Sequence, residues 1–309
     1  MDMDQIQQLM HRKHDAHKGQ SGHVLIIGGS EDYVGATALA GIAALRSGCD
    51  LVTIAAPEKV AWAVNALSPD IMTKKLKGTY LVPKHIKALL LETSEIANRN
   101  LPALARSKMA ISESAQEHAP RAAVLDKYTV IALGNGIGLR WGTKRFCKKL
   151  MRATKNTLKV IDADAIKLLS LQEIQNAIIT PHARELDILL ENSSLVKINQ
   201  IKNKEEKAHT LQKHVGNNVL LLKGPIDYII SKDEIKKISG GNPGMAKAGT
   251  GDVLAGLCAG FLAQTHDRFK SAEAASTINK QIGDSLSKKR GYSFIASDML
   301  GEIKKFKNK

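Results

Sequence analysis

Cysteine and aromatic residues are scarce in this chain of 309 residues. The three cysteines lie far apart, form no C-x-x-C pair and cannot all pair with one another: Cys49, Cys147 and Cys258. This usage favours a reducing compartment, the cytoplasm. Five Phe, five Tyr and two Trp leave little material for an aromatic platform that stacks single-stranded nucleic acid.

Long apolar runs are also absent. No stretch of roughly eighteen apolar residues occurs, so we expect no transmembrane helix. The N-terminus is acidic and polar and has no apolar segment, so we expect no signal peptide. The net charge is high, at +15, but the lysines are scattered along the chain. We interpret this charge as solvated surface and attraction for anionic substrates, with a nucleic-acid site as the alternative.

Short apolar runs typical of buried strands alternate with segments of helical spacing. Strands are expected near residues 23–27, 51–55, 129–133, 158–161, 177–179 and 218–222, followed by an edge hairpin at 227–230 and 234–238. Helices are expected near residues 1–18, 35–46, 166–169, 186–191, 251–264, 270–287 and 296–305. The alternation predicts an α/β fold of three layers, in which a mostly parallel sheet carries helices on both faces and an antiparallel hairpin at one edge. We expect a single domain over residues 1–309, with the least periodic stretch, 68–125, crossing one edge.

Glycine and polar residues gather just after several of the expected strands. These clusters are Gly28-Gly29-Ser30, Gly134-Asn135-Gly136, Asp162-Ala163-Asp164, His182-Ala183-Arg184-Glu185 and Lys223-Gly224. Because ligands of open α/β sheets bind at the carboxyl ends of the strands, we expect these clusters to share one rim. The sequence contains neither G-x-G-x-x-G nor G-x-x-x-x-G-K-[ST], so a different loop must hold any nucleotide phosphates.

The glycine-dense loop over residues 240–251 runs directly into an apolar segment of helical spacing. Amides at such a helix start can converge on an anion, which the helix dipole also favours. Asp252 lies at this junction, where a carboxylate could take a proton from a hydroxyl during phosphoryl transfer. The alternative is that Asp252 only caps the helix and the glycines only form a tight turn.

These motifs together resemble the ADP- or ATP-dependent NAD(P)H-hydrate dehydratases, which have a ribokinase-like fold. The resemblance rests on residues 28–36 and 43–48, on Thr180-Pro181-His182 with Glu185, and on residues 242–252. It spans roughly residues 17–304, with the motifs in the family's order. Gly249-Thr250-Gly251-Asp252 alone would indicate only the wider ribokinase-like fold.

The resemblance implies a repair enzyme that dehydrates (6S)-NAD(P)H hydrate to NAD(P)H at the expense of a nucleotide. The implied route phosphorylates the ring hydroxyl and then eliminates phosphate, with ADP giving AMP and phosphate, or ATP in its place. It also implies Mg2+ as cofactor, a homotetramer and a separate hydrate epimerase in the pathway, and neither a membrane nor a specific nucleic acid as partner.

The resemblance further assigns roles to individual positions. Asp252 would be the base, within an anion hole formed by Gly249, Thr250 and Gly251. The hydrate pocket would be lined by Ala36, Gly136 and His182 together with Asp252. The nucleotide would lie along Lys223, Gly224, Pro225, Ile226 and Asp227, and near Gly251. Glu185, with help from Asp162, would act on magnesium through water.

Plainer interpretations of three of these side chains stay open. His182 could only brace a turn after Pro181, and Glu185 could be a first-turn acid favoured by the helix dipole. Lys223 could be a surface lysine at a strand end.

The chain departs from the family pattern at three positions. Asn135 stands where the family usually has proline between two glycines, and the loop should still turn because Gly134 and Gly136 remain. Asp227 replaces a usual threonine, and its charge would repel phosphates unless magnesium or a lysine intervenes. Lys247 occupies a position that is often small, where it would either contact phosphate or be merely exposed.

Two other functions remain as alternatives. A ribokinase-like kinase of the thiazole or pyrimidine type would share Asp252 and the anion hole. A non-enzymatic nucleotide-sensing or nucleic-acid-binding module would use the positive charge, and would bind with a steep salt dependence.

Overall fold

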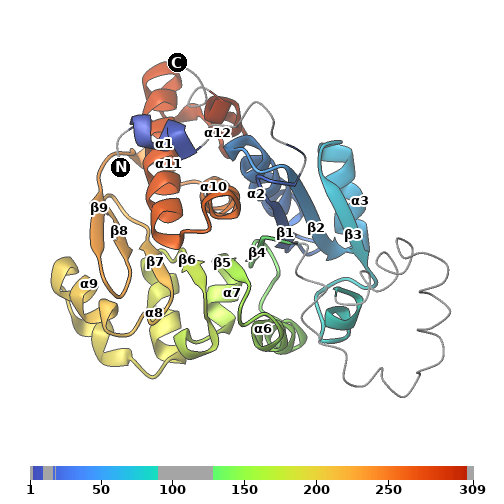
Figure 1. The fold of residues 1–309 in the computed structure, drawn as a ribbon, viewed down its shortest axis with the longest axis horizontal. Helices are drawn as coiled ribbons and strands as arrows, with labels where there is room; N and C mark the ends of the chain where they lie inside the picture. The colour runs from blue at the N-terminus through green and yellow to red at the C-terminus, as the bar shows by residue number, and fades with distance from the viewer. Residues whose placement is uncertain (1–2, 10–16, 18, 90–127, 305–309) are drawn as a thin grey trace.

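The computed structural model describes residues 3–9, 17, 19–89 and 128–304. Nine strands form one sheet in the order β3-β2-β1-β4-β5-β6-β7-β8-β9 (Figure 1). Their bounds are β1 (His23–Ile27), β2 (Leu51–Pro57), β3 (Met72–Leu76), β4 (Val130–Leu133), β5 (Leu158–Ile161), β6 (Ala177–Ile179), β7 (Val219–Leu222), β8 (Asp227–Ile230) and β9 (Ile235–Ile238). Strands β1 to β7 pair in parallel, and β8 and β9 pair antiparallel. The predicted parallel sheet with an antiparallel edge hairpin is confirmed.

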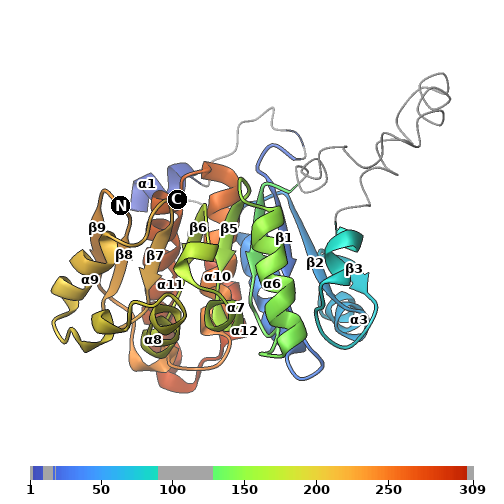
Figure 2. The same cartoon turned by 90° about the horizontal axis from the view of Figure 1, so that it is seen from below.

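Helices cover both faces of this sheet, as Figure 2 shows from a second direction. One layer contains α1 (Met3–Leu9), α2 (Val34–Ser47), α3 (Glu58–Leu67), α10 (Thr250–Thr265), α11 (Arg268–Arg290) and α12 (Ala296–Ile303). The other contains α6 (Trp141–Ala153), α7 (Ala163–Leu168), α8 (Ala183–Asn192) and α9 (Lys204–Gln212). Four short 3-10 turns are also present, Leu171–Glu173, Val196–Gln200, Pro243–Met245 and Gly291–Ser293. Residues 84–89 are helical as well.

Burial on both faces explains why the strands are continuous apolar runs in the sequence. Along β1, Val24 and Ile26 face the layer of α2 and α10, whereas Leu25 and Ile27 face the layer of α6 and α7. Successive side chains of a strand point to opposite faces, so a strand covered on both sides needs apolar residues at every position.

The edge strand β3 was not predicted. It pairs in parallel with β2, with Met72 opposite Thr53, inside the stretch expected only to cross the edge. Its sequence, Met-Thr-Lys-Lys-Leu, has only Leu76 buried and therefore lacks the apolar run that marked the other strands. Residues 90–125 of that stretch, and residues 1–2, 10–16 and 18 of the predicted N-terminal helix, lie outside the described part of the chain.

Helix α10 packs directly on α2 (Figure 1), and this contact sets the position of its N-terminus. A Cβ atom at Gly256 would lie 2.2 Å from the carbonyl oxygen of Ala40, and one at Gly260 would lie 1.9 Å from Ser47 Oγ. Only glycine permits this separation of the two helices. The start of α10 is thereby held against the rim where the strands end.

The sequence has few cysteines and no long apolar runs, and the structure agrees with both observations. The three cysteines are buried free thiols. In the described ranges, none of the helices combines the length and the apolar character needed to span a bilayer.

Candidate active site

The loops that follow the parallel strands meet at one rim, as predicted. Gly29 N donates to Asn135 O at 2.8 Å, which joins the loops after β1 and β4. Lys223 N donates to Pro181 O at 2.9 Å, which joins the loops after β7 and β6. Asp162 follows β5 between these pairs. The start of α10 faces them, because Asn135 Nδ2 donates to Asp252 Oδ1 at 2.7 Å.

The N-terminus of α10 presents backbone amides to this rim. Gly249 is the N-cap residue at φ +90°, and a Cβ atom there would lie 2.7 Å from Leu39 Cδ1 and 2.8 Å from Ala296 Cβ. The first hydrogen bond of the helix runs from Val253 N to Gly249 O at 3.1 Å. The amides of Gly251 and Asp252 precede this bond, so the helix itself does not use them.

A cation lies beside these amides. Lys223 Nζ is 3.6 Å from the place that a Cβ atom on Gly251 would occupy. Two amides at a helix start and one ammonium group form a suitable site for a phosphate, because the dipole and the positive charge act together. The arrangement can therefore hold an anion next to Asp252.

The side chain of Thr250 contributes to the glycine loop and not to the anion site. Its Oγ1 lies 2.8 Å from Met245 O and 2.9 Å from Lys247 O, and its one proton can be donated to either carbonyl. The hydroxyl is therefore directed at the glycine loop and fixes its shape. A part for Thr250 in the anion hole stays a prediction that concerns its backbone alone.

Asp252 is a partly buried acid in the first turn of α10. Its carboxylate does not cap the helix: the N-cap position belongs to Gly249, and no side-chain cap hydrogen bond forms there. The capping alternative is therefore wrong. Burial raises the pKa of Asp252 to about 7, and the hydrogen bond from Asn135 opposes this rise. A carboxyl that titrates near neutral pH can accept and release a proton.

Lys223 is held by two acids. Its Nζ lies 3.2 Å from Asp162 Oδ1 and 3.6 Å from Glu185 Oε2, with 19% of its side chain exposed. Burial alone would lower the pKa of Lys223, but the charges of Asp162 and Glu185 outweigh burial and raise it. The lysine is thus kept as an ammonium, and its interpretation as a surface residue is wrong.

The two acids predicted to act on magnesium are already engaged with protein groups. Asp162 accepts hydrogen bonds from Thr180 Oγ1 at 2.6 Å and from Asn135 Nδ2 at 3.1 Å, besides its contact with Lys223. Glu185 lies against Lys223 and His182. Within the residues that the structure describes, no group of three His, Cys, Asp or Glu could hold a metal ion. The set does not fit direct ligation, and the contact through water stays a prediction.

His182 and Glu185 form a capping box at the start of α8. His182 N donates to Glu185 Oε2 at 3.0 Å, and Glu185 N donates to His182 Nδ1 at 3.3 Å. Two plainer interpretations agree with this geometry: His182 braces the turn after Pro181, and Glu185 is an acid in the first turn of the helix. The His182 side chain is 51% exposed at the rim, so its part in the hydrate pocket stays a prediction.

Ala36 and Gly136 lie next to each other. Gly136 has φ +66°, and a Cβ atom there would lie 3.5 Å from Ala36 Cβ and 2.6 Å from Tyr33 Cβ. Only glycine at this position therefore leaves room for the close approach of the two loops. Tyr33, which is 59% exposed at the same place, was not singled out by sequence reasoning because nothing in its spacing marks it.

Asp227 does not face the solvent at the nucleotide stretch. It is buried, and it accepts hydrogen bonds from Gly224 N at 2.9 Å and from Ser276 Oγ at 2.7 Å. Lys280 Nζ lies 3.3 Å from its Oδ1. Asp227 was expected to repel phosphates unless magnesium or a lysine intervened, and Lys280 is such a lysine. Gly224, Pro225 and Ile226 remain exposed, where a nucleotide could lie along them.

Lys247 neither joins the anion site nor is merely exposed. Its Nζ donates to Phe294 O at 2.8 Å and also to Tyr292 O. Although the residue is exposed, its ammonium group fixes the turn around residues 292–294 and does not join the anion site.

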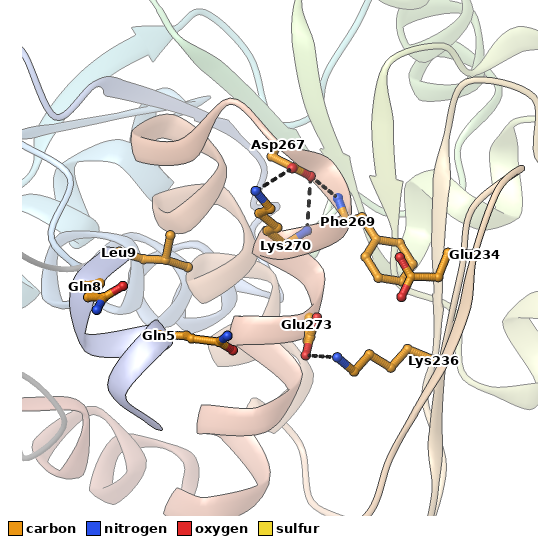
Figure 3. Close-up of a pocket in the computed structure, with 9 residues that line it drawn as sticks. All are labelled: Gln5, Gln8, Leu9, Glu234, Lys236, Asp267, Phe269, Lys270 and Glu273. Atoms are coloured by element: carbon orange, nitrogen blue, oxygen red, sulfur yellow. Dashed lines mark hydrogen bonds and ion pairs between the residues drawn. The ribbon is translucent and has the colours of Figure 1, made fainter. Parts of the chain in front are cut away.

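A separate cavity of about 500 Å3 lies between α1, the start of α11 and the edge strand β9 (Figure 3). It is lined by Gln5, Gln8, Leu9, Glu234, Lys236, Asp267, Phe269, Lys270 and Glu273. Four of its charged side chains form two ion pairs: Lys236 Nζ is 2.6 Å from Glu273 Oε1, and Lys270 Nζ is 3.8 Å from Asp267 Oδ2. The cavity contains none of the predicted site residues.

The sheet order, the two helical layers and the glycine loop before α10 define a ribokinase-like α/β protein. A ribokinase-like superfamily protein from Enterococcus faecalis matches with a TM-score of 0.74 and 24% identity, over 99% of this chain and 94% of that chain. The ADP/ATP-dependent NAD(P)H-hydrate dehydratase from Bacillus subtilis, co-crystallised with ATP/Mg2+, matches with a TM-score of 0.71 and 22% identity, over 99% and 97%. These likenesses show the fold.

The chain belongs to the NAD(P)H-hydrate dehydratase family, whose sequence model matches residues 24–305. It is 33% identical over 297 residues to the ADP-dependent (S)-NAD(P)H-hydrate dehydratase of Nitrosopumilus maritimus, covering 94% of this chain and 90% of that protein. It is 34% identical over 297 residues to the bifunctional NAD(P)H-hydrate repair enzyme Nnr of Pyrobaculum aerophilum, covering 94% of this chain and 52% of that protein. The chain thus spans about half the length of the first curated relatives it matches.

Proposed function

We propose that this chain dehydrates (6S)-NAD(P)H hydrate to NAD(P)H and uses ADP, or ATP in its place, as the phosphoryl donor. The observation that carries the proposal is the position of Asp252 beside the amides of α10 and the ammonium of Lys223. A base next to an anion site is the arrangement that phosphoryl transfer to an alcohol needs. Family membership supports the substrate, and the name of the Nitrosopumilus relative supports ADP.

In the first step, the ring hydroxyl of the hydrate attacks the terminal phosphorus of the nucleotide. Asp252 Oδ1 is engaged with Asn135, so Oδ2 is the oxygen that takes the hydroxyl proton. The phosphoryl group moves to the ring oxygen, and AMP leaves when ADP is the donor. The amides of Gly251 and Asp252 and the Lys223 ammonium stabilise the charge on the transferred group.

In the second step, the phosphorylated ring loses phosphate. Hydroxide is a poor leaving group, whereas phosphate is a good one. The lone pair of the ring nitrogen expels phosphate as the carbon–oxygen bond breaks, and loss of a proton from the neighbouring carbon restores the ring double bond. The oxygen of the original hydroxyl leaves with the phosphate.

Magnesium is proposed only as a companion of the nucleotide. When bound it would neutralise phosphate charge, and Glu185 and Asp162 could reach it only through water because their oxygens contact Lys223, His182, Thr180 and Asn135.

We also propose a location, an oligomeric state and a partner enzyme. A cytoplasmic location agrees with the three buried free thiols. A homotetramer would appear as a fourfold mass in sedimentation equilibrium of the purified chain. A separate hydrate epimerase would supply the S epimer, and adding one should raise the yield from a mixture of epimers.

The test is recovery of the absorbance band of reduced nicotinamide from hydrated NADH, with magnesium and either ADP or ATP. We expect recovery only when a nucleotide is present, and loss of recovery in Asp252→Asn. Nucleotide consumption with accumulation of a phosphorylated product and no NADH would instead indicate a kinase. Full activity of Asp252→Asn would reject Asp252 as the base.

A further inference from the structure

Asn135 lies between the two acids of the rim. Its Nδ2 donates to Asp252 Oδ1 at 2.7 Å and to Asp162 Oδ2 at 3.1 Å. The side chain is fully buried, and its backbone is fixed because Asn135 O accepts a hydrogen bond from Gly29 N at 2.8 Å. The amide therefore joins two carboxylates that come from different elements of the fold.

The orientation of this amide follows from its neighbours. Only the NH2 group can donate to two carboxylate oxygens, which leaves Oδ1 on the other side. Asn135 Oδ1 is buried and has no hydrogen-bond partner among the described residues. An orphaned buried acceptor is unfavourable for the fold, so its presence beside two acids points to a functional constraint.

The bridge extends beyond the two acids. Asp162 Oδ1 accepts from Thr180 Oγ1 at 2.6 Å and contacts Lys223 Nζ at 3.2 Å. The contacts thus run from Lys223 through Asp162 and Asn135 to Asp252. This path connects the ammonium of the anion site with the carboxylate that faces the substrate hydroxyl.

We propose that Asn135 is a positioning residue for the base. Its amide holds Asp252 Oδ1 in place, stabilises the ionised carboxylate next to a second acid, and so leaves Oδ2 directed for proton transfer. This inference rests on the proposed function, because it assigns Asp252 as the base. Proline at this position could not form the bridge because it has no side-chain donor.

The charges around Asp252 determine the sign of the effect. Burial raises the pKa of Asp252 most, the charges of Asp162 and Asp164 raise it further, and the charge of Lys223 lowers it. The hydrogen bond from Asn135 is the largest of the contributions that lower it. Removing the amide leaves Asp252 facing Asp162 without a shared donor, so Asp252 must ionise at higher pH.

The experiment measures kcat/KM for hydrated NADH between pH 5 and pH 9 in the wild type and in Asn135→Leu, a range of roughly two units on either side of neutral. We expect the acidic limb to move up by about one pH unit, with about tenfold loss of rate below it and a near-wild-type rate at high pH. An equal loss at every pH would show a merely structural role and overturn the proposal. Asn135→Pro is the second variant and should behave in the same way.

Asn279→Leu is the matched control. Asn279 is a buried asparagine on α11 whose Oδ1 also lacks a partner in the described part of the chain. We expect this variant to keep the acidic limb where the wild type has it. A limb that moves equally in the control would show that the shift does not come from the contact with Asp252.

A titration without turnover separates this proposal from the proposed function. The carboxyl carbons of aspartate are labelled with 13C, and the Asp252 signal is assigned by its loss in Asp252→Asn. We expect its midpoint to rise in Asn135→Leu, and an unchanged midpoint would overturn the proposal. If wild-type enzyme regenerates no NADH, the function fails while this midpoint still decides whether Asn135 stabilises the charged carboxylate.

Discussion

Asp227 and Lys280 form a buried ion pair beneath the nucleotide stretch. Lys280 Nζ lies 3.3 Å from Asp227 Oδ1, and each side chain is 7% exposed. The same ammonium donates to Gly224 O at 3.0 Å, to Pro225 O at 3.2 Å and to Gly240 O at 3.1 Å. One lysine of α11 therefore neutralises Asp227 and ties the nucleotide stretch to the start of the glycine loop.

Replacing Lys280 with methionine should destabilise the fold strongly. The change leaves a buried carboxylate without its cation and three carbonyl oxygens without a donor, which typically costs about 3–5 kcal/mol. Urea unfolding checks this value. Asp227→Thr combined with Lys280→Met should cost less than Lys280→Met alone, because the uncompensated charge is gone. The control is Lys270→Met, whose lysine side chain is 62% exposed and pairs with Asp267, and it should stay within about 1 kcal/mol of wild type. Equal losses in both single variants would contradict this account.

The burial of Asp252 predicts that stability falls as pH rises. Its pKa is raised from 3.8 to about 7 in the folded chain, so between these values the folded state binds the proton more tightly than the unfolded state. Stability from this group is full below the unfolded pKa and is lost as pH rises through the folded pKa.

Asp252→Asn should therefore gain stability relative to wild type as pH rises from about 4 to about 7, by an amount on the order of 2–4 kcal/mol. Urea unfolding at several pH values measures the difference. A constant difference between variant and wild type would show that the carboxyl is not perturbed in the folded chain.

The two glycines at the start of α10 should respond differently to alanine. Gly249 has φ +90° and no space for a methyl group, so Gly249→Ala should destabilise the fold by about 2 kcal/mol or more. A methyl at Gly251 would make only an ordinary contact, 3.6 Å from Lys223 Nζ. Gly251→Ala should fold normally, yet raise the KM for the nucleotide, because the methyl covers the space between the amides and the ammonium. Thermal unfolding with steady-state kinetics distinguishes the two, and similar behaviour of both variants would argue against the anion site.

Lys223, after β7, and Lys247, in the glycine loop, should respond differently to replacement by methionine. Lys223→Met should reduce kcat/KM by about a hundredfold or more, since it removes the cation beside the transferred phosphoryl group. Lys247→Met should leave the nucleotide KM within about twofold of wild type, because Lys247 Nζ donates its hydrogen bonds to the carbonyl oxygens of Phe294 and Tyr292. A large rise in KM for Lys247→Met would place that lysine in the anion site after all.

The sequence allowed much of the fold to be predicted because burial leaves a strong local pattern. Strands covered on both faces, such as β1 and β4, are uninterrupted apolar runs with glycines at their ends. Strand β3 was missed because an edge strand with Lys74 and Lys75 carries no such run. The rim was predictable from the rule that ligands meet parallel strands at their carboxyl ends.

The partners of the site residues could not be predicted in the same way. Asn135 was visible as a member of a rim cluster and as a departure from a family pattern. Its contact with Asp252 was not, since it joins positions 117 residues apart. Lys280 lies 53 residues beyond Asp227 (280 minus 227) in a helix whose spacing shows nothing unusual. Such pairings depend on how α10 and α11 pack on the sheet, which local patterns do not encode.

The most direct test follows the oxygen of the substrate hydroxyl. Hydrated NADH prepared freshly in 18O-labelled water is given to the wild-type enzyme with ADP, and the released phosphate is analysed by mass spectrometry. Because the account transfers the phosphoryl group to that oxygen before the carbon–oxygen bond breaks, it predicts one 18O atom in each phosphate released. Label that appears in water, with unlabelled phosphate, would show that the ring loses its hydroxyl without being phosphorylated and would contradict the account.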